Sequence, residues 1–71
     1  MDYAKLIDDA RGHLAFMWVV TTQHREQFQD HVQSTVINLR RFADQAEKEG
    51  NTAAAESLRA TADAFESGNI R

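Results

Sequence analysis

Residues 14–31 read LAFMWVVTTQHREQFQDH, and this stretch decides how many helices the chain forms. The apolar residues before and after its polar part keep one helical phase. They belong to a stripe at spacings of three and four that comprises Tyr3, Leu6, Ile7, Ala10, Leu14, Met17, Trp18, Thr21, Phe28, Val32, Thr35, Val36, Leu39, Phe42, Ala43 and Ala46. An unbroken stripe of this kind predicts a single helix over residues about 2–48. Its weak point is Thr21-Thr22, because β-branched residues lower helix propensity and a threonine can cap a new helix.

The long helix is expected to end at residues 49–52, EGNT. Gly50 suits the left-handed residue that follows a helix, and Asn51 or Thr52 can cap the next one. The segment TAAAESLRATADAFES then predicts a helix over residues about 52–67. Its apolar face comprises Ala54, Leu58, Thr61, Ala62 and Phe65. Residues 68–71 are expected to fray, and the absence of proline favours helix along the rest of the chain.

The two helices predict an all-α fold. It is a helical hairpin in a single domain over residues 1–71, with one long N-terminal helix and a short antiparallel return helix. The return helix reaches only residues about 32–48 of the long helix, so it leaves the apolar run LAFMWVV uncovered on all sides. A homodimer, in which two long helices pair into a helical bundle, provides the missing cover. The expected dimer and core seam comprises Leu6, Ala10, Leu14, Thr21, Phe28, Val32, Val36, Leu39, Phe42, Leu58 and Phe65.

Part of the same apolar run is predicted to bind another protein. Aromatic, methionine and arginine side chains are enriched at the centres of protein interfaces. The run is therefore interpreted either as dimer core throughout or as part dimer core and part partner surface. The expected partner-binding residues are Phe16, Met17, Trp18, Val19, Val20, Thr22, Gln23 and Arg25.

The composition excludes several classes of protein. The chain has 71 residues, 8 basic and 11 acidic side chains, a net charge of −3 and no cysteine. The lack of cysteine excludes disulfide scaffolds, thiolate metal sites and cysteine nucleophiles. The longest apolar run is LAFMWVV, whereas a bilayer span needs about 20 apolar residues, and the N-terminus lacks the pattern of a signal peptide. A cytoplasmic protein with no membrane partner is expected.

No metal, cofactor or catalytic site is expected. Two of the three histidines, His24 and His31, would lie two turns apart on one helix with about 10 Å between their Cα atoms, which is too far for one metal ion. They are interpreted as polar members of the seam. The sequence contains neither a nucleophile elbow nor a phosphate-binding glycine loop. The chain is therefore not expected to be an enzyme.

The charged side chains are mixed in sign and predict solvated helix faces. Arg40 is spaced for an ion pair with Asp44 on one helix. Arg59 is spaced in the same way for a pair with Glu56 or Asp63. The densest basic spot is Arg40-Arg41, and acidic residues surround it. Nucleic-acid-binding surfaces usually carry a basic stripe, so nucleic acid is disfavoured as a partner.

The function predicted from the sequence is non-enzymatic protein binding. An inhibitor, anti-activator or adaptor would act sterically, by placing an apolar helix face on its target. Small proteins of this kind are common on phages and other mobile elements. One alternative is an assembly subunit that uses its apolar face only for self-association. A further alternative is a small RNA- or DNA-binding helical bundle.

Overall fold

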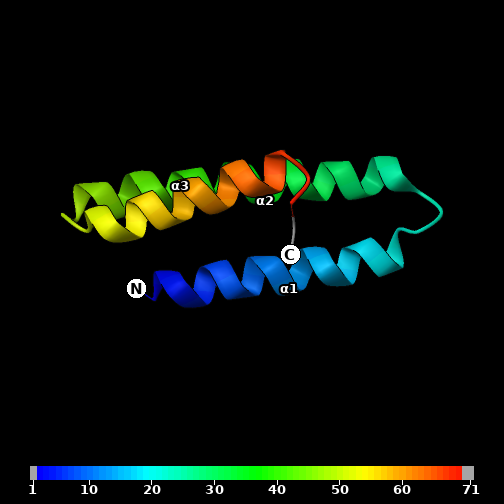
Figure 1. The fold of residues 1–71 in the computed structure, drawn as a ribbon, viewed down its shortest axis with the longest axis horizontal. Coiled ribbons are helices and arrows are strands. Elements are labelled where there is room, and N and C mark those ends of the chain that lie inside the picture. Colours follow the sequence, from blue (N-terminus) through cyan, green and yellow to red (C-terminus); the bar gives the residue numbers. More distant parts are fainter. Residues whose placement is uncertain (1, 70–71) are drawn as a thin grey trace.

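A computed structural model describes residues 2–69 and places them in three α-helices, with no strand in that range. The helices are α1 (Tyr3–Val20), α2 (Arg25–Lys48) and α3 (Thr52–Glu66). The predicted all-α class is confirmed, but the single helix over residues about 2–48 is wrong. The chain reverses direction at residues 21–24, and α1 runs back along α2 and α3 (Figure 1). No described helix is both long enough and apolar enough to cross a membrane.

The end of α1 is closed by hydrogen bonds from side chains, not by a glycine. The Thr21 hydroxyl donates to the Met17 carbonyl at 2.6 Å, and the Thr22 hydroxyl donates to the Val19 carbonyl at 2.7 Å. The Met17 carbonyl also keeps its helical bond from the Thr21 amide at 2.9 Å, so the Thr21 hydroxyl adds a second bond there. The Thr22 hydroxyl binds the Val19 carbonyl, which a continuing helix would have paired with the Gln23 amide. The apolar residues keep the same helical spacing before and after the reversal, because the stripes of α1 and α2 both face one core. Phase continuity therefore could not reveal the break.

The connection between α2 and α3 is the glycine turn that the sequence predicts. Gly50 has a φ of +82°, in the left-handed region, and the Asn51 amide donates to the Ala46 carbonyl at 2.8 Å. The Asn51 side chain then accepts a hydrogen bond from the Ala54 amide and caps α3. This is the Schellman arrangement, and it recurs after α3, where Gly68 has a φ of +90°. The fraying expected of residues 70 and 71 lies outside the described residues.

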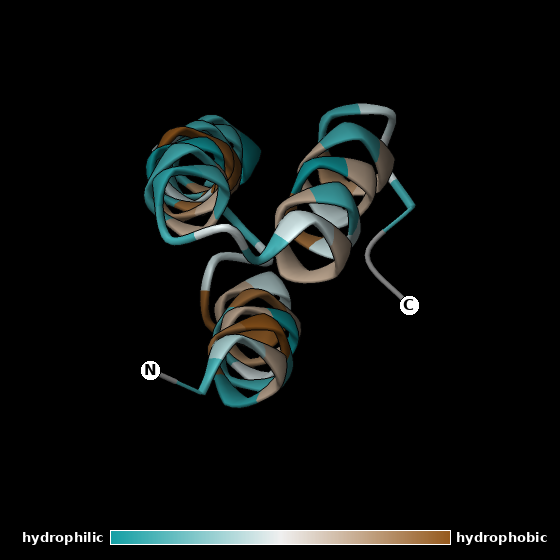
Figure 2. Ribbon diagram, turned by 90° about the vertical axis from the view of Figure 1, so that its left-hand side faces the viewer, coloured by the Kyte–Doolittle hydropathy of each residue, from teal (hydrophilic) through white to brown (hydrophobic). Residues whose placement is uncertain are grey.

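The hydrophobic core forms within one chain. Seen along the bundle in Figure 2, the three helices surround a common centre. Most residues expected in a dimer seam are buried there, namely Leu14, Thr21, Phe28, Val32, Val36, Leu39, Leu58 and Phe65. The other three, Leu6, Ala10 and Phe42, are half-buried and pack against the same core. The first half of the expected long helix is thus not left uncovered, because it folds back as α1 and packs on α2 and α3.

Two arginines join α2 to α3. Arg40 on α2 pairs with Asp63 at 3.0 Å and with Glu66 at 3.1 Å. Arg59 on α3 pairs with two carboxylates of α2, those of Asp44 and Glu47. The expected pairs within single helices are therefore wrong, since both arginines reach across to the neighbouring helix. Exposed ion pairs contribute little stability, but this reciprocal set favours one register of the two antiparallel helices.

Tyr3 ties the N-terminus of α1 to the turn between α2 and α3. The Tyr3 side chain is buried, and its hydroxyl donates to Glu49 Oε1 at 2.5 Å. This hydrogen bond, with partial burial, raises the pKa of Tyr3 above its ordinary value. The same bond, helped by one from Gln45, lowers the pKa of Glu49. Sequence analysis placed Tyr3 on the apolar stripe but did not foresee its partner.

Replacing two of the glycines by alanine should change the free energy of unfolding in opposite directions. Gly50→Ala should lower the free energy of unfolding by about 1 kcal/mol, because a side chain is strained at positive φ. Gly12→Ala should raise it by about 0.5–1 kcal/mol, because Gly12 lies inside α1 with no atom within 4 Å of the added Cβ. Urea unfolding at low protein concentration measures both effects. Equal effects would contradict the assigned conformations.

Tyr3→Phe should remove a pH-dependent part of the stability. The lowered pKa of Glu49 contributes stability that is present above its ordinary value of 4.5 and is lost as the pH falls below it. The raised pKa of Tyr3 contributes stability that is present below 10.0 and is lost as the pH rises above it. The difference in thermal midpoint between wild type and variant should therefore be largest between these two values. An equal difference at acidic and neutral pH would contradict the hydrogen bond.

Candidate functional site

Exposed apolar side chains gather at the C-terminal end of α1. Among the described residues, the exposed large hydrophobics are Phe16 (64% exposed), Trp18 (49%), Val19 (70%), Val20 (56%) and Ile37 (52%). Four of these five lie in the last turn and a half of α1, and we call these four the α1-end cluster. A concentration of this kind on a small protein is typical of an interaction surface.

The α1-end cluster has two faces. At 100° per residue, Phe16, Val19 and Val20 point away from the side of α1 that carries the buried Leu14. We call these three residues the outer face. Trp18 lies on a different side of the helix and contacts α2. The cluster is thus not one continuous patch, and its two faces can serve different partners.

The indole of Trp18 is held from two directions. Its ring meets Phe28 of α2 edge-to-face, with 5.0 Å between centroids and an interplanar angle of 78°. The Arg25 guanidinium lies over the indole, 3.5 Å from the ring centroid, and donates a hydrogen bond to the Trp18 carbonyl at 2.8 Å. Both contacts fix the orientation of a side chain that remains half exposed. Trp18 is therefore a pre-oriented aromatic at the surface.

Trp18 borders a hollow that exists because α3 is shorter than α2. In Figure 1, α3 ends past the middle of α2 and short of its start, so the first turns of α2 continue beyond α3. The hollow measures about 300 Å³ and is lined by Trp18, Phe28, Gln29, Val32, Phe65, Glu66, Ser67 and Gly68. Its lining combines apolar side chains, among them the indole and two phenyl rings, with the amide of Gln29, the carboxylate of Glu66 and the hydroxyl of Ser67. It therefore offers an apolar side chain a place beside the indole.

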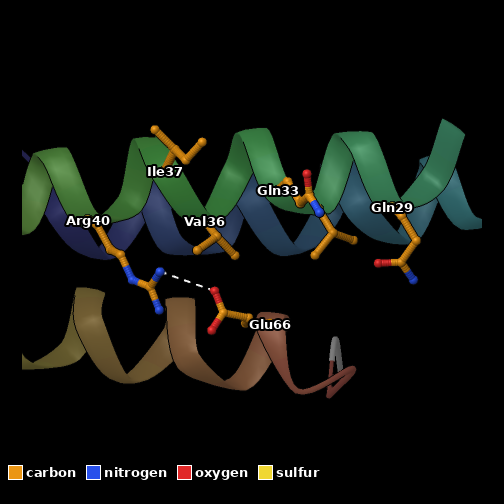
Figure 3. A pocket seen from close by; sticks show the side chains of 7 residues that line it. Gln29, Gln33, Val36, Ile37, Arg40 and Glu66 are labelled. Carbon is orange, nitrogen blue, oxygen red and sulfur yellow. Dashed lines mark hydrogen bonds and ion pairs between the residues drawn. The ribbon is translucent and has the colours of Figure 1, made fainter. Parts of the chain in front are cut away.

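A second hollow of about 380 Å³ continues the first along α2. The two share Gln29, Val32 and Glu66. Figure 3 shows the second hollow: Arg40 reaches toward Glu66, and Ile37 points away from α3. Together the hollows form an open groove beside the end of α3.

The predicted partner-binding residues differ in their exposure and in their contacts within the chain. Met17 is half-buried and packs against the core, so only part of its side chain is exposed. Thr22 and Gln23 are exposed in the α1–α2 connection, while Arg25 is occupied by the indole. The far wall of the hollow, which α3 supplies, was not foreseen. In a helix running unbroken to residue 48, Trp18 would lie far from Phe65. Only the Thr21-Thr22 pair indicated that this helix could break and bring the two residues together.

The histidines are arranged differently from the sequence interpretation. His31 of α2 meets His13 of α1, with 5.4 Å between ring centroids. His24 precedes α2 and is exposed, with its Nδ1 3.7 Å from a Glu26 carboxylate oxygen. Within the described part of the chain, no three histidine or carboxylate side chains are placed to share a metal ion.

The chain matches no known protein-family model, and no curated protein or solved structure is significantly similar to it. The function is therefore argued from the geometry of the α1-end cluster and the adjoining groove.

Arg25→Ala should change the environment of Trp18, which is the only tryptophan. Removal of the guanidinium uncovers one face of the indole, so acrylamide quenching should rise and the emission should shift to the red. Arg41→Ala is the control, because Arg41 lies about 24 Å farther along α2 at 1.5 Å per residue. Equal quenching of the two variants would contradict the stacked arrangement.

Proposed function

We propose that the chain is a non-enzymatic, protein-binding regulator of the cytoplasm, which pairs with a second copy of itself and acts on another protein sterically. The observation that carries the proposal is the half-exposed Trp18, oriented by Phe28 and Arg25 beside an open hollow. Tryptophan and arginine dominate the energetic centres of protein interfaces. The proposed target contact therefore lies on the Trp18 face of the α1-end cluster.

The rigidity of this face supports binding. A surface side chain that is already oriented loses little conformational entropy when a partner packs against it. The hollow is at the small end of the range for ligand pockets and is open to solvent, which suits a protruding side chain better than an enclosed substrate. An apolar side chain of the target would enter it and contact the indole, Phe28 and Phe65. The chain would then obstruct that surface of the target.

A second candidate function is an assembly subunit that binds only copies of itself. The observation that favours it is the uncharged composition of residues 12–23, which include the whole α1-end cluster and contain no Asp, Glu, Lys or Arg. Nucleic-acid binding has less support, because two of the arginines, Arg40 and Arg59, are each held by two carboxylates.

Gln29→Arg tests the proposed target contact. Gln29 is exposed and lines both hollows, so a larger charged side chain there should block the groove without disturbing the core. Tagged wild-type protein would first capture its target from the native host, and purified target would then be titrated. We expect Gln29→Arg to weaken binding at least about tenfold.

The matched control is Gln27→Arg, the same substitution two residues away on α2 and outside the lining of either hollow. It should bind as tightly as wild type. Circular dichroism would establish that both variants keep their helix content. Equal affinities of the two variants would refute the Trp18 face as the target contact.

A further inference from the structure

The outer face of α1 is a second unpartnered apolar surface. Phe16, Val19 and Val20 are each more than half exposed, and Gly12 and Ala15 extend their stripe toward the middle of the helix at spacings of three and four. Nothing lies within 4 Å of the point where a Cβ of Gly12 would be, so the helix surface is notched next to Phe16. This stripe faces away from the core and from the Trp18 hollow, so a partner could occupy it independently.

The charge of this region favours one kind of occupant. Residues 12–23 carry no Asp, Glu, Lys or Arg, although the whole chain has a net charge of −3. The stripe therefore offers no ion pair to a charged target. Homodimer interfaces are more apolar than interfaces between different proteins, and interface cores are depleted in charged residues. Two identical copies can meet at an uncharged surface without facing like charges.

We propose that the occupant of the outer face is the outer face of a second copy, crossing it antiparallel about a two-fold axis near Phe16 and Val19. The proposal rests on the self-association included in the proposed function, and it adds the surface and the orientation. Each Phe16 would pack against the valines of the other copy. The dimer would leave both Trp18 faces open for targets, so one assembly would present two equivalent binding sites.

The acidic residues of α1 favour one orientation, and Lys5 on the same stripe offsets part of their charge. Asp9 lies on the same stripe as Phe16, about 10 Å toward the N-terminus, and Asp8 precedes it. A parallel pairing would place each of these carboxylates opposite its own counterpart. An antiparallel pairing centred near Phe16 and Val19 separates the two Asp9 residues by about 25 Å along the helices. That separation exceeds the screening length of about 8 Å at physiological salt.

A specific dimer would bury a moderate share of the accessible surface of each chain. A standard interface takes about 800 Å² from each partner. That area is about one sixth of the accessible surface of this chain, which is 4773 Å². In the proposed dimer the apolar side chains of the outer face lie at the centre of this area, and polar ones such as Gln23 lie at its rim. The expected dimer is therefore a surface contact between folded monomers.

Analytical ultracentrifugation of wild type and matched variants tests the surface. Wild type should be dimeric at about 100 μM, and the double variant Phe16→Gln/Val19→Gln should weaken the dimer at least about tenfold. Ile37→Gln replaces the exposed hydrophobic of α2 and should leave the dimer unchanged, as should Gln29→Arg. Raising the salt from about 0.05 to 0.5 M should preserve or strengthen the dimer, because it screens repulsion between two acidic chains.

Cysteine cross-linking tests the orientation, since the chain has no cysteine of its own. Val19→Cys lies near the proposed axis and should form a disulfide-linked dimer on mild oxidation. Asp8→Cys and Ile37→Cys should not. A wild-type chain that stays monomeric at about 1 mM, a dimer that survives Phe16→Gln/Val19→Gln, or cross-linking through Asp8→Cys would overturn the proposal. A dimer formed elsewhere would leave the Trp18 contact standing, because Gln29→Arg tests that contact separately.

Discussion

The fold depends on the reversal of the chain at residues 21–24. Hydroxyl groups of Thr21 and Thr22 and the guanidinium of Arg25 together bind the last carbonyls of α1. The bonds to the Trp18 and Val19 carbonyls replace the ones that the next helical turn would have made, whereas the Met17 carbonyl still accepts the Thr21 amide as in a helix. Once α1 turns back, its apolar stripe meets α2 and α3, and the core can close within one chain. Without the reversal, the same stripe would have needed another polypeptide along its whole length.

The lengths of the helices then determine where apolar surface stays open. The reciprocal ion pairs of Arg40 and Arg59 favour a register in which α3 begins beside the end of α2 and stops short of its first turns. The part of α2 beyond that point has α1 on one side only. Trp18 partly fills the vacant position by packing on Phe28. The candidate site is thus a direct result of a third helix that is shorter than the second.

The sequence was sufficient for some features of the fold and not for others. The helical period and the Glu49-Gly50-Asn51 turn predicted the class and the position of the last helix, because both are local properties of the backbone. The break after Val20 was not predicted, because a periodic stripe looks the same whether its two halves lie on one axis or fold together. The partners of Tyr3, Arg40 and Trp18 come from other helices, so no local spacing could identify them.

The candidate site was predicted in part for the same reason. Sequence analysis selected the end of α1 at which four of the five large hydrophobics exposed among residues 2–69 lie. It did not separate the outer face from the Trp18 face, since their division depends on where the core is. It also missed the contribution of α3, because Phe65 and Glu66 approach Trp18 only after the chain has reversed.

The burial of side chains is uneven among the helices, and this makes α1 the helix that separates most easily from the rest. Within its bounds, α1 contributes only Tyr3 and Leu14 as buried residues, whereas α2 contributes six and α3 five. Fewer buried side-chain contacts are therefore lost when α1 detaches than when α2 and α3 separate. We therefore expect the amides of α1 to exchange through a subglobular opening whose free energy lies below that of global unfolding. The segment 21–24 is then a hinge through which α1 can be exchanged between two chains, a route to domain-swapped forms at high concentration.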